Sequence, residues 1–213
     1  MTTIAIIGGT GFAGAAIAAE AARRGNTVTA LSRSTPEKPI DGVTYVQGDV
    51  QTAGASAIAG ADVVIGALSP RAGSEGTLVD TYAELAKQAA ANNARLIVIG
   101  GFGSLRPAPG APRFAEGDAL PPEIAPEARE MNAVREYLSQ TTESVNWTFV
   151  SPAGEFGGYL PVTEPRGTYR TGGEVALFDA DGKSAIGGAD FATAVIDEVE
   201  AAAHPREHIS FAY

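Results

Sequence analysis

The sequence between Thr3 and Arg24 reads TIAIIGGTGFAGAAIAAEAARR, and it combines a strand pattern, a glycine turn and a helix pattern. The Ile-rich run Thr3–Ile7 predicts a short buried strand. The alanine-rich stretch Phe12–Arg24, followed by Gly25, predicts a helix that ends at a glycine. The glycines between the two have a G-x-x-G-x-x-G spacing and are Gly8, Gly11 and Gly14.

Each glycine of this turn has a physical task. The first permits a sharp turn, the second lets the backbone approach a diphosphate, and the third lets the helix pack closely on the strand. Amides at the start of the helix then face the anion at the positive end of the helix dipole. A turn that only connects strand and helix is the alternative, but the complete context favours a dinucleotide site. The residues of this turn expected to bind the cofactor are Gly8, Thr10, Gly11, Phe12, Ala13 and Gly14, with the amides from Thr10 to Ala13 facing the diphosphate.

The residues after the second expected strand, Thr27–Leu31, bear on which dinucleotide is bound. An acidic side chain at that place accepts hydrogen bonds from the ribose hydroxyls of NAD. This sequence instead has Ser32 and Arg33, and a planar guanidinium suits the 2′-phosphate of NADP. The pattern favours NADP(H) over NAD(H), with an ordinary surface arginine as the alternative.

The rest of the chain alternates between apolar runs and helical patterns. This alternation predicts an α/β fold: a single-domain, Rossmann-like, doubly wound parallel sheet with helices on both faces, which spans residues 1–213. Ligands bind such sheets at the carboxyl ends of the strands. The further expected strands are Val43–Val46, Asp62–Ile65, Leu96–Ile99, Trp147–Val150 and Ile209–Ala212, and the further helices are Gln51–Ala59, Gly76–Asn92, Glu127–Gln140 and Asp190–Ala203.

Two long segments lack a regular pattern. Residues 101–126 are rich in proline and glycine, and irregular sequence resumes within residues 151–190. Long irregular segments in a compact domain are usually functional, so we expect both to form the acceptor side of the site. Aromatic residues there would either line an apolar shelf for a planar acceptor or belong to the core; they are Phe102, Phe114, Phe156 and Tyr159.

Composition excludes several functions. A net charge of −10 and a pI of about 4.6 disfavour nucleic-acid and membrane partners. The chain has no cysteine, so it cannot form disulfides or thiolate metal sites, and we expect a cytoplasmic protein. We expect this protein to be a monomer or a homodimer. His204 and His208 are separated by Pro205, which breaks a helix, so we expect both at the surface and predict no metal site.

The sequence resembles the atypical short-chain dehydrogenases/reductases. Within them it is most similar to the NADH-flavin reductase branch, which is NmrA-like and similar to biliverdin reductase B. The resemblance runs nearly end to end. It is carried by the glycine turn and by residues 47–50 (QGDV), 98–105 (VIGGFGSL), 147–153 (WTFVSPA) and 179–184 (DADGKS).

The resemblance implies roles for further residues. Asp49 and Val50 would lie against the adenine, although Asp49 also suits a helix cap. The segment after the fourth strand would pass under the ribose and diphosphate, and it comprises Ala67, Leu68 and Ser69. The residues expected to flank the nicotinamide are Gly100, Gly101 and Pro152.

Classical members of this superfamily exchange protons through a Tyr-x-x-x-Lys pair. The three lysines here follow Ser34, Ala83 and Asp179 by four positions, so the pair is absent. Hydride transfer to a flavin needs positioning rather than a tuned acid or base. We therefore expect an NADP(H)-dependent reductase of a flavin (FMN or FAD), a quinone or a similar planar acceptor. Ser104 is expected nearest the transfer, unless it is only a turn serine.

Two alternatives stay open. One is a regulator that senses NADP(H) without turning it over, as NmrA-like proteins do. The other is an epimerase or dehydratase, for which the C-terminal region is short.

Overall fold

A mostly parallel sheet forms the centre of the molecule. The computed structural model describes residues 1–71, 73–118, 120–161 and 164–213, and within them the sheet has eight strands in the order β3-β2-β1-β4-β5-β6-β8-β7. The strands are β1 Thr3–Ile7, β2 Thr27–Ser32, β3 Val43–Gln47, β4 Val63–Gly66, β5 Arg95–Ile99, β6 Trp147–Pro152, β7 Arg170–Gly172 and β8 Glu207–Ala212. The helices are α1 Phe12–Arg23, α2 Val50–Ile58, α3 Leu78–Ala91, α4 Ala125–Ser139 and α5 Gly188–Ala201, and the short 3-10 turns are η1 Phe102–Ser104 and η2 Phe114–Glu116.

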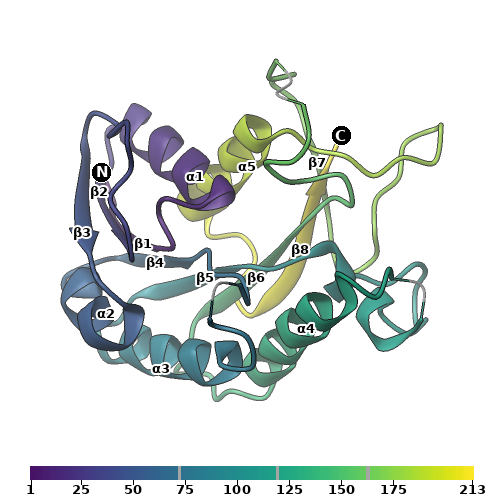
Figure 1. Cartoon of the computed structure of the whole chain (residues 1–213), viewed down its shortest axis with the longest axis horizontal. Coiled ribbons are helices and arrows are strands. Elements are labelled where there is room, and N and C mark those ends of the chain that lie inside the picture. Colours follow the sequence, from purple (N-terminus) through teal and green to yellow (C-terminus); the bar gives the residue numbers. More distant parts are fainter. Residues whose placement is uncertain (72, 119, 162–163) are drawn as a thin grey trace.

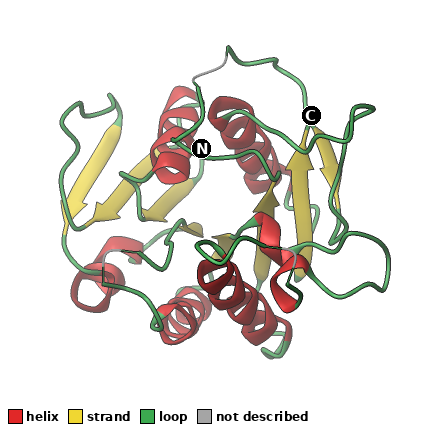
Figure 2. Ribbon diagram, turned by 45° about the vertical axis from the view of Figure 1, so that its right-hand side comes forward, coloured by secondary structure: helices red, strands yellow, loops and turns green. Residues whose placement is uncertain are grey.

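Helices cover both faces of the sheet. Figure 1 shows α1 and α5 on one face and α2, α3 and α4 on the other, and Figure 2 shows the same layers from a second direction. Each interface has its own buried core: Ile17 and Phe191 pack against one face of the strands, whereas Tyr82, Leu85 and Leu138 pack against the other. The predicted doubly wound α/β fold is therefore confirmed.

The strand order reverses between β1 and β4. The chain moves outward from β1 to β2 and β3, and then crosses back to β4, β5 and β6 on the other side. At such a switch point the helices on either side leave the sheet in opposite directions, which opens a crevice at the carboxyl ends of the strands. The glycine turn after β1 lies at this point.

The structure corrects the sequence prediction in places. Strand β7 was not expected, and it runs antiparallel to β8, so the sheet is not wholly parallel. Helix α3 begins at Leu78 rather than at Gly76, because Gly76 has a φ of +77° and cannot belong to the helix. Helix α4 begins before Pro126, and proline is tolerated in the first turn of a helix.

A buried ion pair ties β5 to α5 at the amino ends of the strands. The guanidinium of Arg95 contacts the carboxylate of Glu198 and donates to its backbone oxygen (3.0 Å). Glu198 also contacts Nδ1 of His204 at 2.6 Å. Burial raises the pKa of Glu198, but hydrogen bonds from Arg95 and His204 outweigh it and lower that pKa overall. Glu198 therefore stays ionised inside the protein at neutral pH, paired with Arg95.

None of the helices in the described part of the chain is long and apolar enough to cross a bilayer.

Candidate functional site

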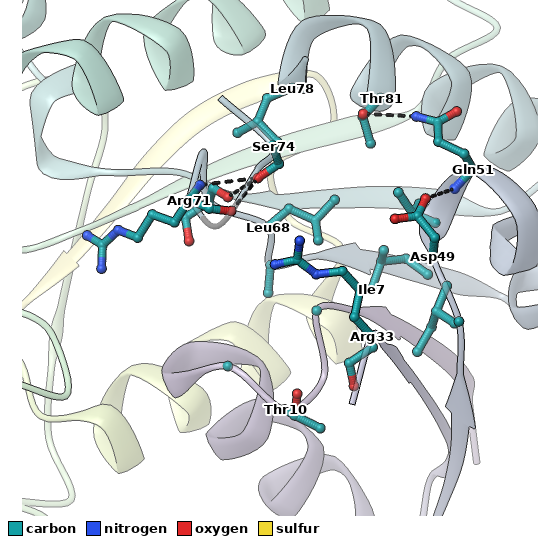
Figure 3. Close-up of a pocket in the computed structure, with 18 of the residues that line it drawn as sticks. Ile7, Thr10, Arg33, Asp49, Gln51, Leu68, Arg71, Ser74, Leu78 and Thr81 are labelled. Carbon is teal, nitrogen blue, oxygen red and sulfur yellow. Dashed lines mark hydrogen bonds between the residues drawn. The ribbon is translucent and has the colours of Figure 1, made fainter. Parts of the chain in front are cut away.

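A cavity of about 460 Å³ opens where the strand order reverses. It lies at the carboxyl ends of β1, β2 and β4, below the starts of α2 and α3, and Figure 3 shows its lining. Many of the predicted cofactor residues line it: Gly8, Thr10, Gly11, Ser32, Arg33, Asp49, Val50, Ala67, Leu68 and Ser69. The structure thus brings together residues from four separate parts of the sequence.

The glycine turn is closely packed and leaves no room for a side chain at Gly8 or Gly14. Gly8 has a φ of +90°, and a Cβ there would lie 2.5 Å from the carbonyl oxygen of Ala67. A Cβ on Gly14 would lie 2.2 Å from the carbonyl oxygen of Gly8. The turn is anchored to β2, since the amides of Gly8 and Gly9 both donate to the oxygen of Leu31 (2.9 and 3.1 Å). Only glycine allows the backbone itself to form the cavity wall here.

The start of α1 presents open amides. The backbone N–H groups of Thr10, Phe12, Ala13 and Gly14 donate to no other residue in the described part of the chain. The N-cap is Gly11, which has no side chain to satisfy them, and the first turn carries no acidic residue. These amides and the positive end of the helix dipole suit an anion such as a diphosphate.

The side chain of Arg33 reaches from the end of β2 into the middle of the cavity (Figure 3). Its backbone is held in place, because its carbonyl oxygen accepts from Nε2 of Gln47 (3.2 Å) and the hydroxyl of Ser32 donates to the oxygen of Ser34 (3.2 Å). The turn after β2 therefore places a cation beside the cavity.

Asp49 caps α2. Its carboxylate accepts from the amide of Gln51 at 2.8 Å, so the capping role considered from the sequence is confirmed. Asp49 also lines the cavity, and its contact with an adenine remains a prediction.

The segment after β4 forms the opposite wall. The amide of Ala67 donates to the oxygen of Ile7 (2.8 Å), and the amide of Leu68 donates to the hydroxyl of Tyr82 (3.1 Å). Tyr82 is fully buried, and burial raises the pKa of its phenol. The phenol is therefore a fixed acceptor for the wall rather than an acid.

Several residues that line the cavity were not predicted from the sequence. Arg71 and Ser74 come from the connection before α3, and Arg71 pairs with Glu127 at 2.8 Å. Gln51 donates to the hydroxyl of Thr81 at 3.1 Å across the top of the cavity (Figure 3). The basic residue two positions after the predicted Ser69 was the one available signal for this wall.

Other predicted residues lie outside this cavity. Gly100 and Gly101 follow β5, and Pro152 is the last residue of the neighbouring strand β6, further along the same edge of the sheet. The side chain of Phe12 lines a second hollow, of about 850 Å³, between α1 and α5. Their expected roles remain predictions.

Ser104 does not fit direct contact with an acceptor. It has no exposed surface, and its hydroxyl has no hydrogen-bond partner among the described residues. The turn η1 encloses it beneath the surface of the site. We therefore do not assign Ser104 a catalytic role.

The aromatic residues of the two long segments form two groups. Phe102 stacks on Phe114, with ring centroids 4.7 Å apart. The ring of Phe156 packs edge-on against Phe12, with centroids 5.1 Å apart, and is tilted against Phe191, with centroids 4.6 Å apart. Tyr159 is 76% exposed. The four residues do not form one continuous shelf. Residues 119 and 162–163 of these segments lie outside the described part of the chain.

The expectation for His208 is wrong. Its imidazole is mostly enclosed, and Nε2 lies 2.9 Å from the hydroxyl of Ser151. Burial, reinforced by Arg113 and Arg135, lowers the pKa of His208 to about 3, so the ring is neutral. No group of three or more side chains suited to a metal ion occurs within the ranges that the structure describes.

The cavity, the open helix start and the glycine turn match a known family. The family model described as NAD(P)H-binding covers residues 8–201. The chain belongs to this NAD(P)H-binding family. It is 34% identical over 209 residues to the uncharacterized protein YwnB of Bacillus subtilis. The aligned residues cover 97% of this chain and 96% of YwnB.

Two solved structures are similar over the whole chain. A Burkholderia pseudomallei protein, provisionally described as exported, is 34% identical with a TM-score of 0.86, and all of both chains is covered. A Streptococcus pneumoniae protein, provisionally named an NADH-flavin reductase, is 31% identical with a TM-score of 0.87, covering 100% of this chain and 99% of that one. These matches confirm the resemblance to atypical short-chain dehydrogenases/reductases. The expected cytoplasmic location remains a prediction.

Proposed function

We propose that this protein binds NADP(H) and passes hydride to a flavin, a quinone or a similar planar acceptor. One observation supports the proposal: the glycine turn, with the open amide of Thr10 at the start of α1, lines the same cavity as Arg33. The amides suit a diphosphate, and Arg33 suits a further phosphate on the adenosine ribose. The similar Streptococcus protein, provisionally named an NADH-flavin reductase, supports the same class of reaction.

The residues fit the cofactor in shape as well as charge. A Cβ on Gly8 would clash with the backbone of Ala67, and a Cβ on Gly14 would clash with the backbone of Gly8, so glycine at both positions keeps the turn in its close-packed shape beside the cavity. The first turn of α1 holds no carboxylate that would repel phosphate. Once bound, the nicotinamide supplies the hydride, and the protein's task is to hold donor and acceptor in register.

The protein orients the nicotinamide and the acceptor, and its side chains do not transfer the proton. It lacks the Tyr-x-x-x-Lys pair, and Ser104 is enclosed. A flavin or quinone can take its proton from solvent, so a reductase of such acceptors needs no tuned acid in the site.

Calorimetric titration with NADPH and NADH tests the cofactor. In the variant Arg33→Ser, we expect the Kd for NADPH to rise about 10- to 100-fold, since a hydrogen bond to a charged group contributes about 1.5–3 kcal/mol. The Kd for NADH should change little. Arg71→Ser is the matched control, because Arg71 lines the same cavity while it pairs with Glu127, and its effect should be small.

Mixing the protein with NADPH and FMN tests the reaction. Loss of NADPH absorbance above the background rate is the expected result. Tight NADPH binding without turnover of any flavin or quinone would instead support a regulator that senses NADP(H). No binding of either dinucleotide would overturn the proposal.

A further inference from the structure

A chain of hydrogen bonds runs beneath the turn that follows β5. Nη1 of Arg113 lies 3.3 Å from Nδ1 of His208. Nε2 of His208 lies 2.9 Å from the hydroxyl of Ser151, and that hydroxyl lies 2.9 Å from the carbonyl oxygen of Gly101. We call this chain, from Arg113 through His208 and Ser151 to the Gly101 carbonyl, the Gly101 relay.

The direction of each bond in the relay follows from its first member. A guanidinium only donates, so Nδ1 of His208 accepts and carries no proton. The ring is neutral, because its pKa is lowered to about 3, and its single proton is therefore on Nε2. Nε2 donates to Ser151, which leaves the serine proton for Gly101. If the hydrogen bonds ran the other way, the N–H on Nδ1 of His208 would point at the guanidinium of Arg113. The Gly101 oxygen would then lose the hydrogen bond from Ser151.

The start of the relay is rigidly held. Arg113 is only 3% exposed, and Nη1 also donates to the carbonyl oxygen of Ser104 at 2.5 Å. Its other terminal nitrogen pairs with Glu174, which also forms an ion pair with Arg106 (3.2 Å). The guanidinium that sets the tautomer of His208 is thus fixed by contacts with Ser104 of η1 and with Glu174.

The end of the relay fixes the backbone of the turn. The Gly101 oxygen accepts from the amide of Ser104 (3.2 Å) as well as from Ser151, and the amide of Gly100 donates to Val150 (2.8 Å). The ring of Phe149 fills the space below Gly100, where a Cβ would lie 2.2 Å from a ring atom. Because a peptide unit is planar, holding the Gly101 oxygen also fixes the N–H that follows it.

We infer that His208 and Ser151 are positioning residues for hydride transfer, which act through the carbonyl of Gly101. This inference rests on the proposed function and on the predicted position of Gly100 and Gly101 beside the nicotinamide. Neither His208 nor Ser151 would touch the cofactor. Loss of the relay should disturb the alignment of donor and acceptor while the dinucleotide stays bound at the distant glycine turn.

Two buried serines give a matched test. Ser151 of β6 and Ser210 of β8 are partners in the sheet, both are at most 2% exposed, and each hydroxyl donates to a glycine carbonyl at 2.9 Å. Ser210 donates to Gly173, away from the turn. We expect Ser151→Ala to slow single-turnover oxidation of bound NADPH by FMN about tenfold, since small misplacements of reacting groups have large effects on rate. Ser210→Ala should leave that rate unchanged.

Three further readouts separate positioning from loss of structure. The Kd for NADPH should stay within about twofold in both serine variants, since the diphosphate site is untouched. The fluorescence anisotropy of the bound nicotinamide should fall in Ser151→Ala alone. In the unliganded wild-type protein, ¹⁵N NMR should show Nδ1 of His208 unprotonated, and a protonated Nδ1 would contradict the relay.

A pair of His208 variants carries the test if Ser151→Ala fails to fold. His208→Gln keeps an N–H donor near the place of Nε2 and should restore most of the rate. His208→Phe keeps the packing against Phe149, whose ring centroid is 5.0 Å away, but has no donor, and it should be as slow as Ser151→Ala. Equal rates for the two serine variants, or for the two His208 variants, would overturn the relay while NADPH still binds. A wild-type protein that does not bind NADPH would instead overturn the proposed function and this inference with it.

Discussion

Replacement of Gly14 by alanine should damage the glycine turn, although alanine is the better helix former. Gly14 lies in the first turn of α1. A Cβ there would lie 2.2 Å from the oxygen and 2.9 Å from the carbon of the Gly8 carbonyl, and 3.1 Å from Cα of Gly9. These are backbone atoms that cannot rotate away. The helix would have to withdraw by about 1 Å to restore ordinary contact distances.

The structure gives the size of the effect. Overpacking of this kind costs about 1–3 kcal/mol, and alanine returns about 1 kcal/mol of helix propensity. We expect a net loss of about 1–2 kcal/mol in the free energy of unfolding. A shift of about 1 Å also takes the α1 amides out of hydrogen-bond range of a diphosphate. Loss of one such bond should raise the Kd for NADPH about 10- to 100-fold.

Gly54 of α2 supplies the control, because it is also a buried glycine inside a helix. A Cβ there would meet only side-chain atoms, Cγ2 of Val50 at 3.4 Å and Oε1 of Gln88 at 3.8 Å. Gly54→Ala should therefore stabilise the protein by about 0.5–1 kcal/mol. Urea unfolding and calorimetric titration with NADPH measure both quantities. If Gly14→Ala matched Gly54→Ala in stability and bound NADPH as the wild type does, the reasoning would be refuted.

Three more substitutions have definite expected outcomes. Glu198→Gln should cost about 3–5 kcal/mol at neutral pH, because it leaves the buried Arg95 charge unpaired. Since the folded-state pKa of Glu198 is lowered, the wild type should lose this advantage as the pH falls below the ordinary value of 4.5, and urea unfolding at stepped pH would show the two proteins converging. Ser104→Ala should leave the melting temperature and the rate of NADPH oxidation unchanged or slightly raised, because the hydroxyl has no described partner; a rate that fell tenfold would restore Ser104 as a catalytic candidate. Tyr82→Phe should cost about 0.5–1.5 kcal/mol, because it removes the hydroxyl to which the partly buried amide of Leu68 donates, and a variant with unchanged thermal stability would show that this bond contributes little.

The part of the fold that local sequence determines was predicted well. The first strand, the glycine turn and α1 are fixed by contacts among neighbours in the chain, such as the close approach of Gly14 to Gly8. Strand β7 was missed for the opposite reason. Its three residues, Arg170–Gly172, are mainly exposed and show no apolar alternation, so only pairing with β8 makes them a strand.

The residues of the candidate site fall into the same two groups: some are marked by local sequence, and others meet only through the fold. The turn residues and Arg33 could be found because strand ends and glycine spacing mark them in sequence. Gln51 and Thr81 meet across 30 residues of chain, and nothing local marks either. His208 was misjudged because its partners, Ser151 and Arg113, are 57 and 95 residues away, and burial by distant segments leaves no local pattern.

The two ends of the site should respond differently to substitution, because different kinds of contact hold them. The glycine-turn end is held by backbone contacts within the turn and to Leu31 of β2, so a change at Gly14 should alter binding and rate together. The turn at Gly101 is held by side chains from β6, β8 and the segment before η2. A change at Ser151 should therefore alter the rate without altering dinucleotide affinity. If Gly14→Ala and Ser151→Ala changed Kd and rate in the same proportion, the two ends of the site would not be separately supported.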